Sequence, residues 1–159
     1  MIHEGHRKVI FLDTIVDARM DDFRREFINA VSAHLEQGGN NRLYRPEEMS
    51  LRGIRMLMEK IGVQEPRATA FVLSDNFYAE AVLDCLAQRG VRVGNDCRIV
   101  GFGDTILAER CRPKLSHYGL RIEEQVAFGL QALVEAIEHP KRFNPRQCKL
   151  PPRYIPGET

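Results

Sequence analysis

Four polar residues lie where ligands bind in α/β proteins, and their types suit the recognition of hydroxyl groups. Arg19, Ser74, Asp75 and Asp104 each follow an apolar, strand-like run at the point where a helix or turn begins. A guanidinium fork, a hydroxyl and two carboxylates donate and accept hydrogen bonds in pairs, as the hydroxyls of a sugar require. The residues by themselves leave a plainer interpretation open, in which Ser74 and Asp75 cap a helix and Arg19 forms a surface ion pair.

Other chemistries find less support in the residue pattern. Residues 101–103 form an incomplete dinucleotide-binding fingerprint, because Ile106 stands where its third glycine belongs. His3 and His6 are spaced for a metal but lack neighbouring ligands, which favours surface histidines. Cys85 lies on the apolar side of a predicted helix, which favours a small core residue. The sequence therefore predicts no cofactor and no metal.

Acidic residues near the first strand leave one enzymatic alternative open. Asp13, Asp17, Asp21 and Asp22 resemble a group that binds a metal or assists phosphoryl transfer. Acids near the N-terminus of a helix also stabilise its dipole, which explains most of them without a ligand. A small doubly wound, metal-dependent enzyme that uses Asp13 with Asp104 stays an alternative, whereas our prediction is that the chain is not an enzyme.

Apolar runs alternate with helical patterns along the chain. Short β-branched and aromatic runs predict strands at 8–12, 42–44, 68–73, 97–102 and 115–118. Apolar residues at helical spacing predict helices at 17–36, 46–61, 76–88 and 121–137, with a turn at 103–105. Strands separated by helices indicate β-α-β units. We therefore predict an α/β fold with a doubly wound, mostly parallel sheet of four to six strands and helices on both faces.

Length and composition exclude several classes of protein. The chain has 159 residues, of which 43% are hydrophobic and 28% charged, as in ordinary globular domains. No apolar run approaches the ~18 to 20 residues of a membrane span, and the N-terminus lacks the features of a signal peptide. The 23 basic and 22 acidic side chains give a net charge of +1, so there is no general attraction to DNA or membranes. Four dispersed cysteines predict reduced thiols, and we expect a cytoplasmic protein.

Five segments resemble patterns of one protein family, in the family's order and spacing. They are residues 5–12, 18–23, 53–57, 68–75 and 89–102. Residues 68–75 resemble the pattern P-T-A-hydrophobic-F-x-x-(N/S)-D, and residues 89–102 resemble G-hydrophobic-R-V-P-x-D-hydrophobic-x-V-V-G-F-D-D. The three earlier segments resemble G-H-R-R-I-A-F-I, A-R-x-x-G-F and G-Y-x-A-M. Together they are similar to the lactose-repressor/galactose-repressor family of bacterial transcription regulators.

The resemblance implies the fold of the periplasmic sugar-binding proteins, in which two α/β subdomains enclose an effector. It assigns residues 1–120 to the second subdomain, 121–140 to a helix that in the family crosses to the first subdomain, and 141–159 to a tail that returns to the second. The family's DNA-binding helix-turn-helix and most of its first subdomain have no counterpart in the sequence. The resemblance thus implies that DNA is bound only through a part that these residues do not include.

The resemblance also implies an effector site. Arg19 matches the family's effector-binding arginine, and Ser74 matches its Asn or Ser contact, with Asp75 beside it. Of the aspartates in G-F-D-D only Asp104 is present, because Gly103 stands in place of the first. We therefore predict the effector-binding part of a transcription regulator that senses a sugar or a related small molecule and forms a homodimer or larger assembly. A free-standing sugar-binding or interaction module is the alternative from a third class.

Overall fold

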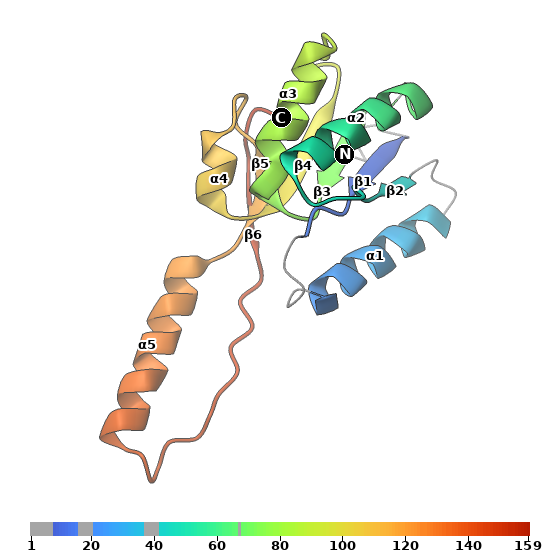
Figure 1. Ribbon diagram of the computed structural model, residues 1–159. Helices are drawn as coiled ribbons and strands as arrows, with labels where there is room; N and C mark the ends of the chain where they lie inside the picture. The colour runs from blue at the N-terminus through green and yellow to red at the C-terminus, as the bar shows by residue number, and fades with distance from the viewer. Residues whose placement is uncertain (1–7, 16–20, 37–41, 67) are drawn as a thin grey trace.

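Six strands form one sheet in the computed structural model, which describes residues 8–15, 21–36, 42–66 and 68–159 (Figure 1). The strand order is β2-β1-β3-β4-β5-β6. The parallel strands are β1 (Val9–Leu12), β2 (Arg42–Tyr44), β3 (Ala70–Leu73), β4 (Arg98–Gly103) and β5 (Ser116–Gly119). β6 (Arg153–Ile155) is antiparallel and lies at the edge beside β5. The prediction of a mostly parallel sheet is confirmed.

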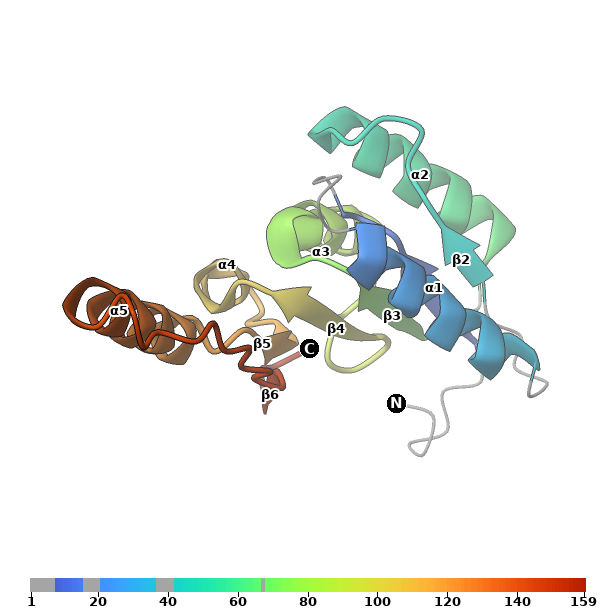
Figure 2. The same cartoon turned by 90° about the horizontal axis from the view of Figure 1, so that it is seen from below.

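Helices lie on both faces of this sheet, as predicted. The α-helices of the described residues are α1 (Asp21–Glu36), α2 (Leu51–Gln64), α3 (Ala79–Gln88), α4 (Thr105–Arg110) and α5 (Ile122–Glu138). α2 and α3 pack side by side over one face (Figures 1 and 2). α1 meets the other face, where Phe27 makes an edge contact with Phe11 of β1 at a centroid distance of 6.1 Å. Within the described ranges, no helix has the length and apolar character needed to cross a membrane.

Two helices begin where the sequence pattern did not predict them. α2 begins at Leu51, later than predicted, because the side chain of Ser50 caps it by accepting a hydrogen bond from the Gly53 N–H at 3.1 Å. The residues predicted as a turn at 103–105 lead instead into α4, because Asp104 caps a short helix there. Local capping by one polar side chain decided both boundaries.

Alternating strand residues fill the core between the sheet and the helices α2 and α3. Leu12 of β1 pairs in register with Leu73 of β3, and Phe71 of β3 pairs with Ile99 of β4, so each pair shares a face of the sheet. These side chains are buried against apolar helix residues. The helix residues are Ile54, Leu57, Met58, Ile61, Val82, Leu83 and Leu86. Burial of this one face fixes the register of the central strands, because a slip of one residue would expose it.

The cysteines are unpaired, and three of them belong to the packed interior. Cys85, Cys97 and Cys111 are buried, and Cys148 is exposed. Burial raises the pKa of the Cys97 thiol to about 12, which keeps it in the unreactive protonated form. Cys85 is a core residue, as predicted.

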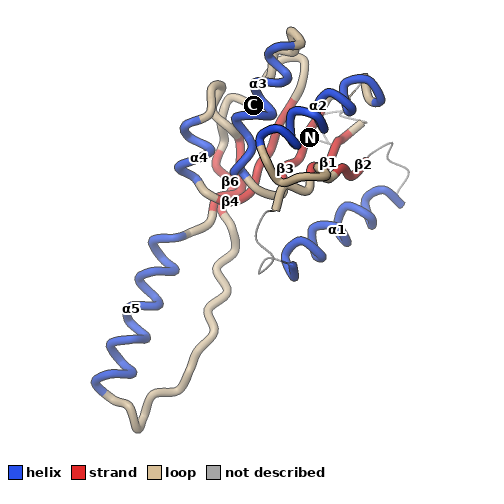
Figure 3. Tube along the Cα trace, viewed as in Figure 1, coloured by secondary structure: helices blue, strands red, loops and turns tan. Residues whose placement is uncertain are grey.

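α5 lies apart from the core. It extends away from the sheet, and a loop leads from its end back to β6 (Figures 1 and 3). No residue of α5 is buried, and its apolar side chains at helical spacing are 44–70% exposed. This apolar stripe consists of Ile122, Val126, Leu130, Leu133, Val134 and Ile137. A helix of a globular protein normally buries such a stripe against another surface.

A buried carboxylate holds the amino ends of two strands to the end of α2. Glu65 forms ion pairs with Lys8 and, at 2.9 Å, with Arg42, and it accepts a hydrogen bond from the Tyr44 hydroxyl at 3.0 Å. The hydrogen bond from Lys8 is the main reason that the pKa of Glu65 is lowered, against the effect of burial, which raises it. The charged form of Glu65 is therefore the one that stabilises the fold.

Replacing Glu65 with Gln is expected to lower the free energy of unfolding by about 1–3 kcal/mol at neutral pH, because hydrogen bonds to a charged group are lost. Since the pKa of Glu65 is lowered in the folded protein, its contribution is present above the unfolded value of 4.5 and is lost as the pH falls through the folded value. Urea unfolding of both proteins at pH 7 and at about pH 3 tests this. The difference should shrink at the lower pH, and Glu59→Gln at an exposed position of α2 should change little.

Candidate functional site

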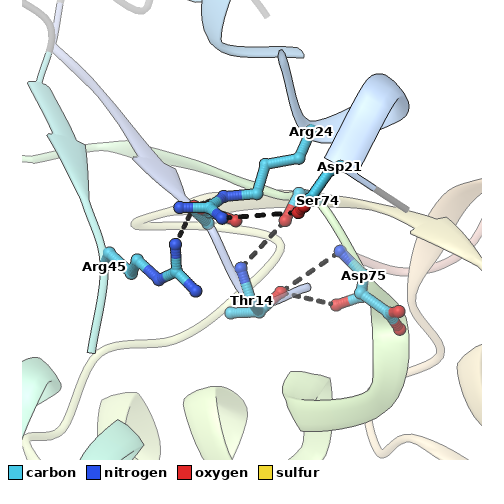
Figure 4. Close-up of polar contacts among 7 residues, drawn as sticks. Thr14, Asp21, Arg24, Arg45, Ser74 and Asp75 are labelled. Atoms are coloured by element: carbon cyan, nitrogen blue, oxygen red, sulfur yellow. Dashed lines mark hydrogen bonds and ion pairs between the residues drawn. The ribbon is translucent and has the colours of Figure 1, made fainter. Parts of the chain in front are cut away.

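The loops that follow β1 and β3 are joined by hydrogen bonds among Thr14, Ser74 and Asp75 (Figure 4). The Thr14 N–H donates to Ser74 Oγ at 2.8 Å. The Asp75 N–H donates to Thr14 Oγ1 at 3.2 Å, and Thr14 Oγ1 donates to the Asp75 carbonyl oxygen at 3.1 Å. Thr14 and Ser74 are buried. These bonds fix the carboxyl ends of two neighbouring parallel strands relative to each other.

Ser74 and Asp75 play different local roles. Ser74 supports the contact between the loops, and its own N–H donates to the Leu12 carbonyl oxygen at 3.0 Å. The helix cap is Asp75, whose Oδ1 accepts a hydrogen bond from the Phe77 N–H at 2.8 Å at the start of the 3-10 turn η3 (Asn76–Tyr78). The plainer interpretation from the sequence thus describes Asp75 correctly and is wrong for Ser74, which caps no helix.

Asp104 forms the same kind of cap at the end of β4. Its Oδ1 accepts hydrogen bonds from the N–H groups of Ile106 at 2.7 Å and Leu107 at 3.4 Å. The buried side chain of Asn76 donates from Nδ2 to the Asp104 carbonyl oxygen at 3.1 Å, which ties the loop after β4 to the loop after β3. Among the described residues, no hydrogen bond reaches Oδ2 of Asp75 or of Asp104. Each cap therefore keeps one carboxylate oxygen available.

The two capping aspartates interact electrostatically. Burial raises the pKa of Asp75, and the negative charge of Asp104 raises it further, against the hydrogen bond from Phe77, which lowers it. Gly103, which precedes Asp104, has φ of +117°, a conformation that glycine adopts without strain. Three predicted site residues, Ser74, Asp75 and Asp104, thus come together at the carboxyl edge of the sheet. The free carboxylate oxygens of Asp75 and Asp104 favour ligands that donate hydrogen bonds.

An ion-pair cluster at the same edge was missed by the sequence analysis. Asp13 directly follows β1, is buried, and accepts a hydrogen bond on Oδ2 from Arg24 Nε at 2.7 Å. Arg45, which follows β2, places Nη1 3.8 Å from the same oxygen. The signal available in the sequence was an acid immediately after an apolar run. That signal did not distinguish Asp13 from the acids of the following helix.

The remaining predicted residues are candidates for metal binding or for the effector site. The described residues contain no group of three or more His, Cys, Asp or Glu side chains arranged to hold a metal ion. Asp13, one of the two acids of the enzymatic alternative, is already engaged with Arg24. Arg19, Asp17, His3 and His6 lie outside the described residues. The place of Arg19 in the site therefore stays a prediction.

Comparison with known proteins assigns the chain to a protein family. Residues 1–159 match the family described as the periplasmic binding protein-like domain. The arabinose metabolism transcriptional repressor of Geobacillus stearothermophilus is 28% identical over 141 residues, which cover 87% of this chain and 39% of that protein.

Two solved structures show the likeness of fold. A LacI family transcriptional regulator from Arthrobacter sp. FB24 in complex with lactose superposes with a TM-score of 0.80 at 20% identity, covering 99% of this chain and 59% of the other. A LacI family regulator from Enterococcus faecium with bound ribose gives a TM-score of 0.76 at 18% identity, covering 98% and 57%. This chain thus spans less than two thirds of the length of each relative. These matches confirm the resemblance found in the sequence, and the chain belongs to the family of periplasmic binding protein-like domains.

Proposed function

We propose that the chain is the C-terminal part of the effector-binding domain of a LacI/GalR-type transcription regulator, and that it senses a sugar or a related small molecule. The observation that carries the proposal is the convergence of Ser74, Asp75 and Asp104 at the carboxyl edge of the sheet. Ligands of parallel α/β sheets bind at this edge. The lactose and ribose bound to two relatives of the same fold support a sugar as the class of effector.

The chemistry of the edge suits this role. The free oxygens of Asp75 and Asp104 accept hydrogen bonds from hydroxyl groups, and the guanidinium of Arg19 is proposed to donate to hydroxyl oxygens from the loop after β1. An effector alters DNA affinity only when it binds two conformations of the regulator with different free energies. We propose that DNA recognition belongs to the part of such a regulator that this chain does not cover, and that the regulator acts in the cytoplasm.

The same proposal assigns the parts of the chain. Residues 1–120 form the second subdomain, 121–140 the helix that crosses to a first subdomain, and 141–159 the returning tail. The exposed apolar stripe of α5 supports the assignment of a crossover helix that needs another surface. The tail assignment is supported by β6, which pairs with β5, and by buried Thr159, whose hydroxyl donates to the Ile99 carbonyl oxygen at 2.7 Å.

The isolated chain is expected to bind a sugar weakly, in the millimolar range, because one wall of the proposed cleft is absent from it. Loss of one charged hydrogen-bonding partner costs about 1.5–3 kcal/mol, or roughly 10- to 150-fold in affinity. NMR shift titration with a sugar panel should therefore detect binding by the wild type and none by Arg19→Ala. The exposed Arg52→Ala on α2 is the matched control and should bind like the wild type. Equal binding by Arg19→Ala would locate the site elsewhere, and micromolar binding would favour a free-standing module.

Association of the chain is expected through α5. At tens of micromolar, sedimentation should show a dimer or larger species, because the apolar stripe is exposed in the single chain. The double variant Val126→Lys, Leu130→Lys places two charges in the stripe and should weaken association at least roughly tenfold. Gln125→Lys adds a charge to the same helix outside the stripe and should leave association unchanged. A wild type that sediments only as a monomer contradicts the proposal.

A further inference from the structure

Asp13 is a buried carboxylate with one satisfied and one unsatisfied oxygen. Its backbone N–H donates to the Tyr44 carbonyl oxygen at 2.9 Å, which holds it at the carboxyl ends of β1 and β2. Oδ2 accepts the hydrogen bond from Arg24 at 2.7 Å. Oδ1 is buried and has no hydrogen-bond partner among the residues that the structure describes. Buried polar atoms are almost always paired, because an unpaired one costs the desolvation of that group. We therefore expect Oδ1 to accept a hydrogen bond from a bound ligand.

The neighbouring arginines have N–H donors that lack acceptors in the part of the chain that the structure describes, since each guanidinium carries five N–H groups. Arg45 lies 3.8 Å from Asp13 Oδ2, beyond hydrogen-bond distance, and its side chain is 44% exposed. No hydrogen bond of the Arg45 guanidinium occurs within the described residues. Arg24 uses Nε on Asp13, and its Nη1 lies 3.8 Å from Asp21, a solvated acid. Arg45 thus forms an ion pair with Asp13 Oδ2, but among the described residues its N–H donors make no hydrogen bond beside the unpaired oxygen Oδ1.

This corner adjoins the proposed effector site. Asp13 is followed directly by Thr14, whose N–H and hydroxyl bond to Ser74 and Asp75 (Figure 4). The corner and the capping aspartates therefore lie along one edge of the sheet. The Arg45 guanidinium, with no hydrogen bond among the described residues, lies at the β2 end, and the free carboxylate oxygens of Asp75 and Asp104 lie at the β3 and β4 ends. A ligand that satisfies the whole edge needs an anionic group as well as several hydroxyls.

We propose that the corner of Asp13, Arg24 and Arg45 recognises a hydroxyl next to a carboxylate, so that the effector is a hydroxylated carboxylic acid of the aldonic acid type. The inference rests on the proposed function and names the class of its effector. The α-hydroxyl of such a ligand donates to Asp13 Oδ1, and its carboxylate accepts hydrogen bonds from the Arg45 fork. The remaining hydroxyls donate to Asp75 and Asp104. A neutral sugar satisfies Asp13 but offers the Arg45 fork no carboxylate with which to form paired hydrogen bonds.

NMR shift titration or calorimetry on the full 159-residue chain tests this with five probes. They are D-gluconate, D-galactonate, the neutral parent sugars D-glucose and D-galactose, and 2-deoxy-D-gluconate, which lacks the α-hydroxyl. At least one aldonate should bind at least roughly tenfold tighter than its parent sugar and, for gluconate, than its 2-deoxy form, as expected for one charged hydrogen-bonding partner. Arg45→Gln should weaken aldonate binding at least tenfold, whereas Arg55→Gln, at an exposed position of α2, should not.

The outcomes separate this inference from the proposed function. Neutral sugars that bind as tightly as their aldonates overturn the inference and leave the proposed function intact. A 2-deoxy probe as tight as gluconate, or an Arg45→Gln protein that keeps full aldonate affinity, overturns the role of the Asp13 corner. If neither sugars nor aldonates bind, the proposed function fails together with the inference.

Discussion

The hydrogen bond from the Thr14 N–H to Ser74 Oγ joins two loops that lie 60 residues apart in the chain, and the geometry of the candidate site depends on it. Beyond the end of β1 the backbone N–H of Thr14 no longer has a partner in the sheet, and it is buried. The serine hydroxyl satisfies it there, at a site where an unpaired donor would cost about 1–3 kcal/mol. Because β1 and β3 are adjacent and parallel, this one bond sets the spacing of the side chains that follow both strands.

The capping aspartates serve two purposes at this edge. One oxygen of Asp75 and one of Asp104 satisfies the first N–H groups of a helix, which positions each side chain rigidly. The other oxygen of each stays available to a ligand. The pKa of Asp75 is raised mainly by burial and further by the negative charge of Asp104. Carboxylates with a shifted pKa are common at binding sites, because a bound ligand supplies the hydrogen-bond donor that the protein does not.

α5 also carries groups that have no partner within the described residues, in this case apolar side chains along a whole helix. Its sequence repeats apolar residues at helical spacing, but the body of the sheet offers them no surface. The chain corresponds to less than two thirds of the length of its relatives. The exposed stripe is the observation behind our proposal that α5 packs against another protein surface. The sheet needs no such completion for its own core, which is closed by α2 and α3.

The sequence by itself determined the alternation of strands and helices, because apolar periodicity reflects which face of each element is buried, and it identified three of the side chains at the carboxyl edge. It did not determine the cap at Ser50 or the short helix after Asp104, since one side-chain hydrogen bond decides such boundaries. It also did not reveal the role of Asp13. An acid after a strand becomes a site component only when distant residues surround it, and Arg45 reaches Asp13 because β2 pairs with β1. Strand order is a property of the tertiary structure, and it decided that Arg45 became a neighbour of Asp13.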